Sequence, residues 1–255
     1  MQIKTNLYPH ADDIFEQLLF TTVRIECLDQ QGIPSCIGTG FFLEKQLGDG
    51  AYKIFLVSNR HVLHAGVDTI KLWLTRAKGG RPLVGQCEHI LIERVGRMVM
   101  HPEVDLAVLD CTALFARFPG SLYFKAIPYE SLADFEEPEL SVADPVYFVG
   151  YPEGISDTQN NLPLMRKGMI SSYPKLDFDG QPQVVIDAQV FPGSSGSPAF
   201  VSLGNPVPAP ERMPTVKLLG VVTASYLKGL RPIGLGIVIK STCLNQLIDE
   251  ITGCK

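Results

Sequence analysis

The chain has 255 residues with 22 basic and 27 acidic side chains, so its formal net charge is −5. Hydrophobic residues make up 45% and charged residues 19%, which excludes an intrinsically disordered chain. The negative balance argues against a nucleic-acid-binding protein, which needs a basic face. Glycine and proline make up 42 of the 255 residues (23 plus 19), which is a larger share than the usual one of roughly 12%. This excess predicts many turns between short strands.

Export and membrane signals are weak in this sequence. Residues 1–10 hold no apolar core of signal-peptide length, and the uncharged stretch 188–210 carries five prolines and three glycines. The cysteines lack Cys-x-x-Cys spacing, so no zinc site is expected. Because no export signal is evident, we expect reduced thiols in a cytoplasmic protein without a cofactor. The six cysteines are Cys27, Cys36, Cys87, Cys111, Cys243 and Cys254.

The N-terminal half is predicted to be one short helix followed by strands. The helix spans 11–20, with Asp12 or Asp13 as its cap and Ile14, Leu18 and Leu19 on one face. Apolar and β-branched runs between turn clusters then predict strands at 21–28, 37–43, 52–57, 69–74, 84–99 (broken at Gly96) and 106–109.

A proline-rich crossover at about 113–144 separates this half from a second set of strands. These are predicted at 146–150, 165–172, 184–190, 198–202, 216–224 and 235–239. A last helix at 241–252 has Ser241 as its cap and Gly253 as its stop. We therefore predict one all-β domain over 1–255, built from two six-stranded antiparallel β-barrels (about 20–112 and 145–240) with short terminal helices.

Segment 191–198, with the sequence Phe-Pro-Gly-Ser-Ser-Gly-Ser-Pro, is the sharpest chemical signal. Two glycines around a pair of serines indicate a tight turn that only small residues can follow. Such a turn can aim successive backbone N–H groups at one point, which is the geometry of an oxyanion hole with a serine hydroxyl at its rim. An ordinary loop between strands is the alternative interpretation.

A nucleophilic serine needs a base, and the five histidines all precede Ser195. This order excludes the α/β-hydrolase arrangement, in which the histidine comes last. The order His, Asp, Ser of the double-barrel proteases remains. An Asp, His, Ser order is formally open, but it belongs to a helix-rich fold that the strand pattern does not support. The histidines are His10, His61, His64, His89 and His101.

His61 is the best candidate for the base because it directly follows a strand that is expected to be buried. His64 shares its turn, but no third ligand is evident, so no metal site is expected. Asp105 is the best candidate for the acid because it opens a short apolar run, where a carboxylate needs partners. Asp110, at the other end of that run, is its rival.

Four short sequence motifs, here called boxes, contain these candidates and follow one another in a fixed order along the chain. The sequence resembles the trypsin-like serine peptidases, and within them the bacterial HtrA/DegP-like branch. The similarity extends over about residues 14–250, with further likeness at 149–152, 168–171, 219–222 and 234–237. The four boxes are Thr39-Gly40-Phe41-Phe42, Ser58-Asn59-Arg60-His61-Val62, Asp105-Leu106-Ala107-Val108 and the segment 187–198.

The resemblance implies a site in the cleft between two barrels, with acyl-transfer chemistry on a protein or peptide substrate. His61 would be the general base, Asp105 its orienter and Ser195 the nucleophile. The backbone N–H groups of Gly193 and Ser195 would form the oxyanion hole.

The resemblance also suggests where the substrate binds. A substrate strand is expected to pair with the edge at Thr223, Ala224, Ser225 and Tyr226. Gln189 and Phe191 are expected beside it. Because position 189 is Gln rather than Asp, we expect neutral, apolar side chains to be preferred over Arg or Lys.

Departures from the secreted enzymes qualify this expectation. Val62 and Phe191 stand where those enzymes carry disulfide cysteines, and Ser194 stands where zymogen-activated enzymes have Asp. We therefore expect no activation through an ion pair with a new N-terminus. No PDZ segment is expected, and the sequence leaves the oligomeric state open. A non-catalytic peptide-binding module that keeps the fold is the main alternative function, and an esterase is a third.

Overall fold

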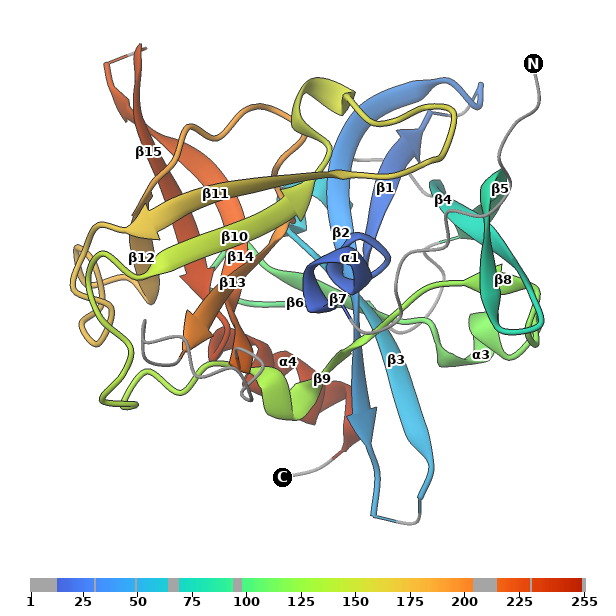
Figure 1. Ribbon diagram of the computed structural model, residues 1–255, viewed down its shortest axis with the longest axis horizontal. Coiled ribbons are helices and arrows are strands. Elements are labelled where there is room, and N and C mark those ends of the chain that lie inside the picture. The colour runs from blue at the N-terminus through green and yellow to red at the C-terminus, as the bar shows by residue number, and fades with distance from the viewer. Residues whose placement is uncertain are drawn as a thin grey trace.

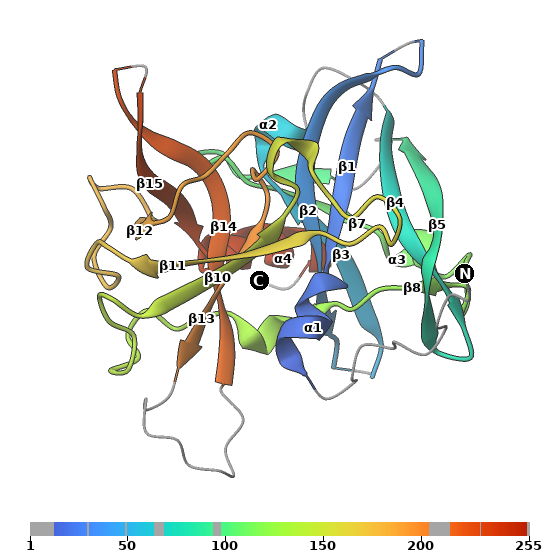
Figure 2. The same cartoon turned by 45° about the horizontal axis from the view of Figure 1, so that its top comes forward.

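A computed structural model describes residues 13–29, 31–48, 50–63, 69–93, 98–203, 215–229 and 231–253. Two β-structures lie side by side in it, one from each half of the chain (Figure 1). Figure 2 shows the same division from a second direction, with helix α1 (Ile14–Leu19) in front of the junction.

The N-terminal half forms a nine-stranded sheet. Seven strands follow the order β5-β4-β1-β2-β3-β7-β6, in which every neighbouring pair is antiparallel. Two short strands join it from the crossover, β8 against β4 and β9 parallel to β2. The strands are β1 Thr22–Leu28, β2 Pro34–Gln46, β3 Tyr52–Ser58, β4 Thr69–Lys78, β5 Arg81–Glu93, β6 Met98–Met100, β7 Ala107–Asp110, β8 Leu122–Tyr123 and β9 Ile127–Pro128.

The C-terminal half forms a closed antiparallel barrel of six strands, in the order β10-β11-β12-β15-β14-β13. Closure leaves no unpaired sheet edge along most of the barrel. The strands are β10 Pro145–Gly150, β11 Leu164–Ile170, β12 Gln183–Asp187, β13 Pro198–Leu203, β14 Thr215–Lys228 and β15 Arg231–Lys240.

Short helices connect and close these sheets. Asp13 caps α1 by accepting from the N–H groups of Phe15 and Glu16. The C-terminal helix α4 ends at Gly253, which is left-handed with φ of 70° as a helix stop requires. Its N-cap is Thr242 rather than the expected Ser241, and no side chain caps it. The other helices are α2 Arg60–Leu63, α3 Thr112–Phe115, and the 3₁₀ turns η1 Tyr129–Ser131 and η2 Pro152–Gly154.

Three apolar clusters hold the fold together. One fills each half, and the third lies between them. In this third cluster Phe41 and Phe55 of the N-terminal sheet join Phe200 and Val221 of the barrel. Helix α4 packs against the same cluster through Leu244, Leu247 and Ile248, so the chain's last helix braces both halves.

The predicted all-β double-barrel architecture is confirmed. The N-terminal sheet differs in detail, because it has nine strands rather than six, and no pairing between β5 and β6 closes it within the described residues. The additional strands β8 and β9 have two residues each and lie in the proline-rich crossover. Two residues are too short to show the alternation that marks a strand in a sequence.

Gly220 lets the backbone of β14 lie closer to the backbone of β15 than any side chain at this position would allow. A Cβ placed there would lie 1.9 Å from the carbonyl oxygen of Ile239 in β15. We expect Gly220→Ala to lower the free energy of unfolding by about 1–3 kcal/mol, since this backbone must move. The matched control is Gly48→Ala, where no atom lies within 4 Å. Equal urea midpoints for both variants would contradict this packing.

Candidate active site

His61 is presented by the turn that follows β3. Asn59, directly after the strand, donates from its side-chain amide to the carbonyl oxygen of Asp105 at 2.8 Å. Helix α2 then buries Val62 and Leu63, while the side chain of His61 stays 51% exposed. The apolar residues therefore anchor the turn, and the imidazole faces out from it.

Asp105 holds this imidazole with both carboxylate oxygens. Its Oδ1 accepts from the backbone N–H of His61 at 2.9 Å, and its Oδ2 lies 2.5 Å from Nδ1 of the ring. The hydroxyl of Thr223 in β14 donates to the same Oδ2 at 2.9 Å. The acid thus connects a turn of the N-terminal sheet with a strand of the barrel.

These contacts shift the pKa values of His61 and Asp105 in opposite directions. The hydrogen bond to Asp105 raises the pKa of His61 above its ordinary 6.5, although burial opposes the rise. Burial raises the pKa of Asp105, but the hydrogen bonds and charge of His61 outweigh it, and the net pKa lies below its ordinary value. The pair therefore favours an ionised carboxylate beside a more basic imidazole.

Ser195 belongs to the same group through Thr223. Its hydroxyl donates to the carbonyl oxygen of Thr223 at 3.1 Å, and no hydrogen bond to His61 is formed. Hydrogen bonds between nucleophile and base are often loose before a substrate binds. Rotation about the Cα–Cβ bond of Ser195 would move the hydroxyl away from Thr223.

The turn before Ser195 directs its carbonyl groups into the protein. The carbonyl oxygen of Pro192 accepts from the N–H of Glu153 at 2.6 Å, and that of Gly193 accepts from the hydroxyl of Thr39 at 2.7 Å. Gly193 is left-handed with φ of 83°, and a Cβ there would meet the carbonyl oxygen of Tyr151 at 2.4 Å. Only glycine fits this position.

The N–H groups of Gly193 and Ser195 are left available as a result. Within the described part of the chain, neither donates to a protein acceptor. In a trans peptide the C=O and the following N–H point in opposite directions. Because Glu153 holds the Pro192 carbonyl, the N–H of Gly193 is turned the other way. The turn thus offers two unoccupied N–H donors, which is the kind of group that an oxyanion hole uses.

Thr39 of β2 fastens this turn to the N-terminal sheet. Its N–H donates to the carbonyl oxygen of Ser195 at 2.9 Å, and its hydroxyl also accepts from the N–H of Tyr151 at 3.1 Å. Its own carbonyl oxygen accepts from the Ser58 hydroxyl at 2.6 Å. The side chain is fully buried, so these hydrogen bonds are shielded from water.

The other sequence candidates lie elsewhere. Asp110 forms an ion pair with Lys53 at 3.3 Å, which removes it as the partner of His61. His101 is buried and accepts from the N–H groups of Glu103 and Val104, as a turn residue does. His89 lies on β5 against Trp73. His10 and His64 fall outside the described residues.

The predicted substrate edge at 223–226 has one strand neighbour. Pairing of β14 with β13 ends at Val221, whereas pairing with β15 continues past Ser225. Within the described residues, no strand pairs with 223–226 on its other side, where the Thr223 carbonyl accepts from the Ser195 hydroxyl. Thr223 has a second role there, since it contacts both Asp105 and Ser195, and the Ser225 hydroxyl donates to the carbonyl oxygen of Val190.

Arg166 on β11 contacts the predicted pocket segment, and no sequence pattern indicated this contact. Its guanidinium donates to the carbonyl oxygen of Gln189 and lies 5.1 Å from the ring centroid of Phe191. The side chain of Gln189 is exposed. Glu153 was not identified from the sequence either. In the structure its φ is 52°, a value that is rare outside glycine. A Glu-Gly pair after a strand was the only signal for this turn.

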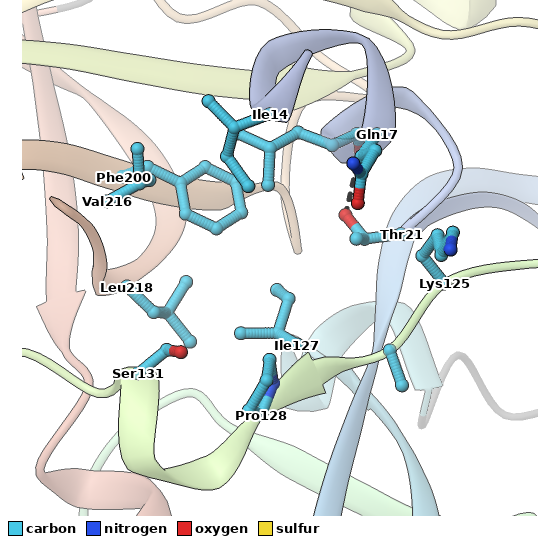
Figure 3. Close-up of a pocket in the computed structure, with 12 residues that line it drawn as sticks. Ile14, Gln17, Thr21, Lys125, Ile127, Pro128, Ser131, Phe200, Val216 and Leu218 are labelled. Atoms are coloured by element: carbon cyan, nitrogen blue, oxygen red, sulfur yellow. Dashed lines mark hydrogen bonds between the residues drawn. The ribbon is translucent and has the colours of Figure 1, made fainter. Parts of the chain in front are cut away.

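A separate apolar cavity of about 270 Å³ lies where α1 meets the barrel. Figure 3 shows Ile14 of α1, Phe200 of β13, Leu218 of β14 and Ile127 of β9 pointing into it. None of His61, Asp105 and Ser195 lines it. The candidate active site is therefore the hydrogen-bonded group of His61, Asp105, Thr223 and Ser195, and not this cavity.

Metal-binding clusters and membrane-spanning helices are both absent from the described residues. No group of three or more His, Cys, Asp or Glu side chains is placed to hold a metal ion. No helix there has the length and apolar character needed to cross a lipid bilayer.

Comparison with known proteins agrees with the geometry. A family model described as the trypsin-like peptidase domain matches residues 38–207, so the chain belongs to this family. No protein of curated function matches the chain.

Solved structures show the same fold. The HtrA-type protease AlgW with a tripeptide has a TM-score of 0.57 at 20% identity, over 93% of this chain and 62% of that chain. An alanine variant of AlgW with a tripeptide gives 0.56 at 19%, over 92% and 61%. An inactive serine-to-alanine form of Rv3671c from M. tuberculosis H37Rv gives 0.51 at 18%, over 98% of both chains. The chain spans less than two thirds of the AlgW chains.

The raised pKa of His61 can be measured directly. We expect an NMR titration of its imidazole to give a pKa above 6.5, and we expect Asp105→Asn to lower it. A histidine whose folded pKa is raised stabilises the fold below its unfolded pKa, and this stability is lost as pH rises through the folded pKa. Asp110→Asn is the control and should leave the titration of His61 unchanged. An identical pKa in the Asp105 variant would contradict the assigned contact.

Proposed function

We propose that the chain is a serine endopeptidase that hydrolyses peptide bonds through an acyl-enzyme. The observation that carries this proposal is the shared hydrogen-bonded group of His61, Asp105, Thr223 and Ser195, beside a turn that exposes two N–H groups. A structural role alone needs neither a half-exposed imidazole nor a partly buried carboxylate aligned on it.

In the proposed reaction Ser195 is the nucleophile. A bound substrate displaces its hydroxyl from Thr223 toward Nε2 of His61, which takes the proton as the oxygen attacks the peptide carbonyl. Asp105 keeps the Nδ1–H tautomer and stabilises the imidazolium without accepting the proton itself. The N–H groups of Gly193 and Ser195 stabilise the oxyanion. Water then releases the acyl group through the same base.

The open edge of β14 supports a peptide as substrate. An extended peptide can add as a strand along 223–226, where a strand pairs on one side only within the described residues. This would bring a scissile carbonyl beside Ser195, because Thr223 contacts the nucleophile directly. The tripeptide-bound AlgW structures are consistent with such binding.

A peptide-binding module without catalysis is the second candidate. The observation that favours it is the hydrogen bond of Ser195 to Thr223 instead of His61. A cytoplasmic location and a reaction without cofactor remain part of the proposal. Both rest on the sequence.

Turnover of an unstructured protein substrate distinguishes the two candidates. We expect hydrolysis by the wild type and none above background by Ser195→Ala, with peptide binding retained. Asp105→Asn should lower kcat by about 10⁴, because the tautomer of His61 is no longer held. Ser141→Ala, at an exposed serine, is the matched control and should keep full activity. Binding without turnover by the wild type would favour the second candidate.

A further inference from the structure

Two cysteines face each other across the first two strands. Cys27 of β1 and Cys36 of β2 are direct antiparallel partners. In such pairs the Cα atoms lie about 4.5–5.5 Å apart, and both side chains point to the same face of the sheet. A disulfide needs Cα atoms roughly 4.4–6.8 Å apart. The backbone therefore already has the spacing for a bond between these two sulfurs, which stand as thiols in the structure.

The two thiols lie next to the turn that carries His61. Cys27 is fully buried, and its Sγ is 3.0 Å from the carbonyl oxygen of Val62, the residue after His61. Cys36 is only half-buried, hydrogen-bonds with Cys27, and lies near enough for its charge to interact with that of His61. One cysteine of the pair is thus partly exposed, and the other is buried.

The environment of Cys36 also makes it reactive. The hydrogen bond with Cys27 lowers the pKa of Cys36 to about 6; burial opposes this fall and the charge of His61 adds to it. A thiol with this pKa is roughly nine tenths thiolate at pH 7, whereas an ordinary one is a few per cent thiolate. Burial instead raises the pKa of Cys111 to about 12 and that of Cys243 to about 11. Of these three thiols, only that of Cys36 is made more acidic.

We propose that Cys36 and Cys27 form a redox-active dithiol beside His61, in which Cys36 reacts with a peroxide and Cys27 closes the disulfide. The Cys36 thiolate attacks one peroxide oxygen, the O–O bond breaks, and a sulfenic acid and hydroxide form. The Cys27 sulfur then displaces the hydroxyl from Cys36 and loses its proton. Two thiols and one hydrogen peroxide give one disulfide and two waters.

The disulfide would change the surroundings of the site. It would remove the negative charge of Cys36, which is one of the influences that raise the pKa of His61. It would also fix β2 to β1 three residues before Thr39, which holds the nucleophile turn. Any effect on peptide turnover rests on the proposed function, but the thiol chemistry does not.

The test follows the sulfurs themselves, in the full chain with Ser195→Ala, so that it is independent of peptidase activity. At pH 7 we expect iodoacetamide to alkylate Cys36 about two- to threefold faster than the exposed Cys87, because the larger thiolate fraction outweighs the lower nucleophilicity of a more acidic thiol. After one equivalent of hydrogen peroxide the intact mass should fall by two hydrogens, and peptide mapping should join Cys27 to Cys36.

Three variants make the result specific. Cys36→Ser should prevent the mass change, Cys27→Ser should stop at a sulfenic acid that dimedone traps on Cys36, and Cys87→Ser should behave like its parent. If Cys27→Ser does not fold, Cys36→Ser decides alone, since that side chain is half-buried. Equal alkylation of Cys36 and Cys87, or a disulfide between other cysteines, would overturn the proposal.

Discussion

The geometry of the candidate site depends on the hydrogen bonds of Thr39. Its N–H, its hydroxyl and its carbonyl each form a hydrogen bond, and these bonds join β2 and β3 to the nucleophile turn of the barrel. Each such bond contributes about 0.5–1.5 kcal/mol, but leaving a buried partner unpaired costs about 1–3 kcal/mol. The turn therefore keeps the shape in which the carbonyl of Gly193 faces inward. The availability of the two N–H groups follows from this constraint.

A second link between the halves is electrostatic. Asp105 comes from the N-terminal sheet, yet one of its partners is the Thr223 hydroxyl of the barrel. A partly buried carboxylate is costly unless it is hydrogen-bonded, and His61 and Thr223 supply these bonds. The same interactions raise the basicity of His61. The apolar cluster between the halves and helix α4 hold the two sheets in the relation that this contact requires.

Much of this arrangement could be predicted from the sequence. Histidine order, the apolar run after Asp105 and the Gly-Ser-Ser-Gly turn indicated the residues that the structure brings together. The sequence motif that contains Thr39 was recognised but its role was not, and Glu153 and Arg166 could not be identified in this way. Each acts through a contact with a segment far away in the chain, and two of them use backbone groups, which every residue has. The strands β8 and β9 were missed because two residues show no period.

Ser195 is proposed to be a nucleophile activated by its neighbours, and a fluorophosphonate tests this activation directly. Such a reagent forms a stable bond only with a serine whose hydroxyl is deprotonated as it attacks and whose oxyanion is stabilised. We predict one phosphonyl group per chain, mapped to Ser195 by peptide mass spectrometry. An unmodified mass at the pH where His61 is neutral, or a label on another residue, would contradict the account.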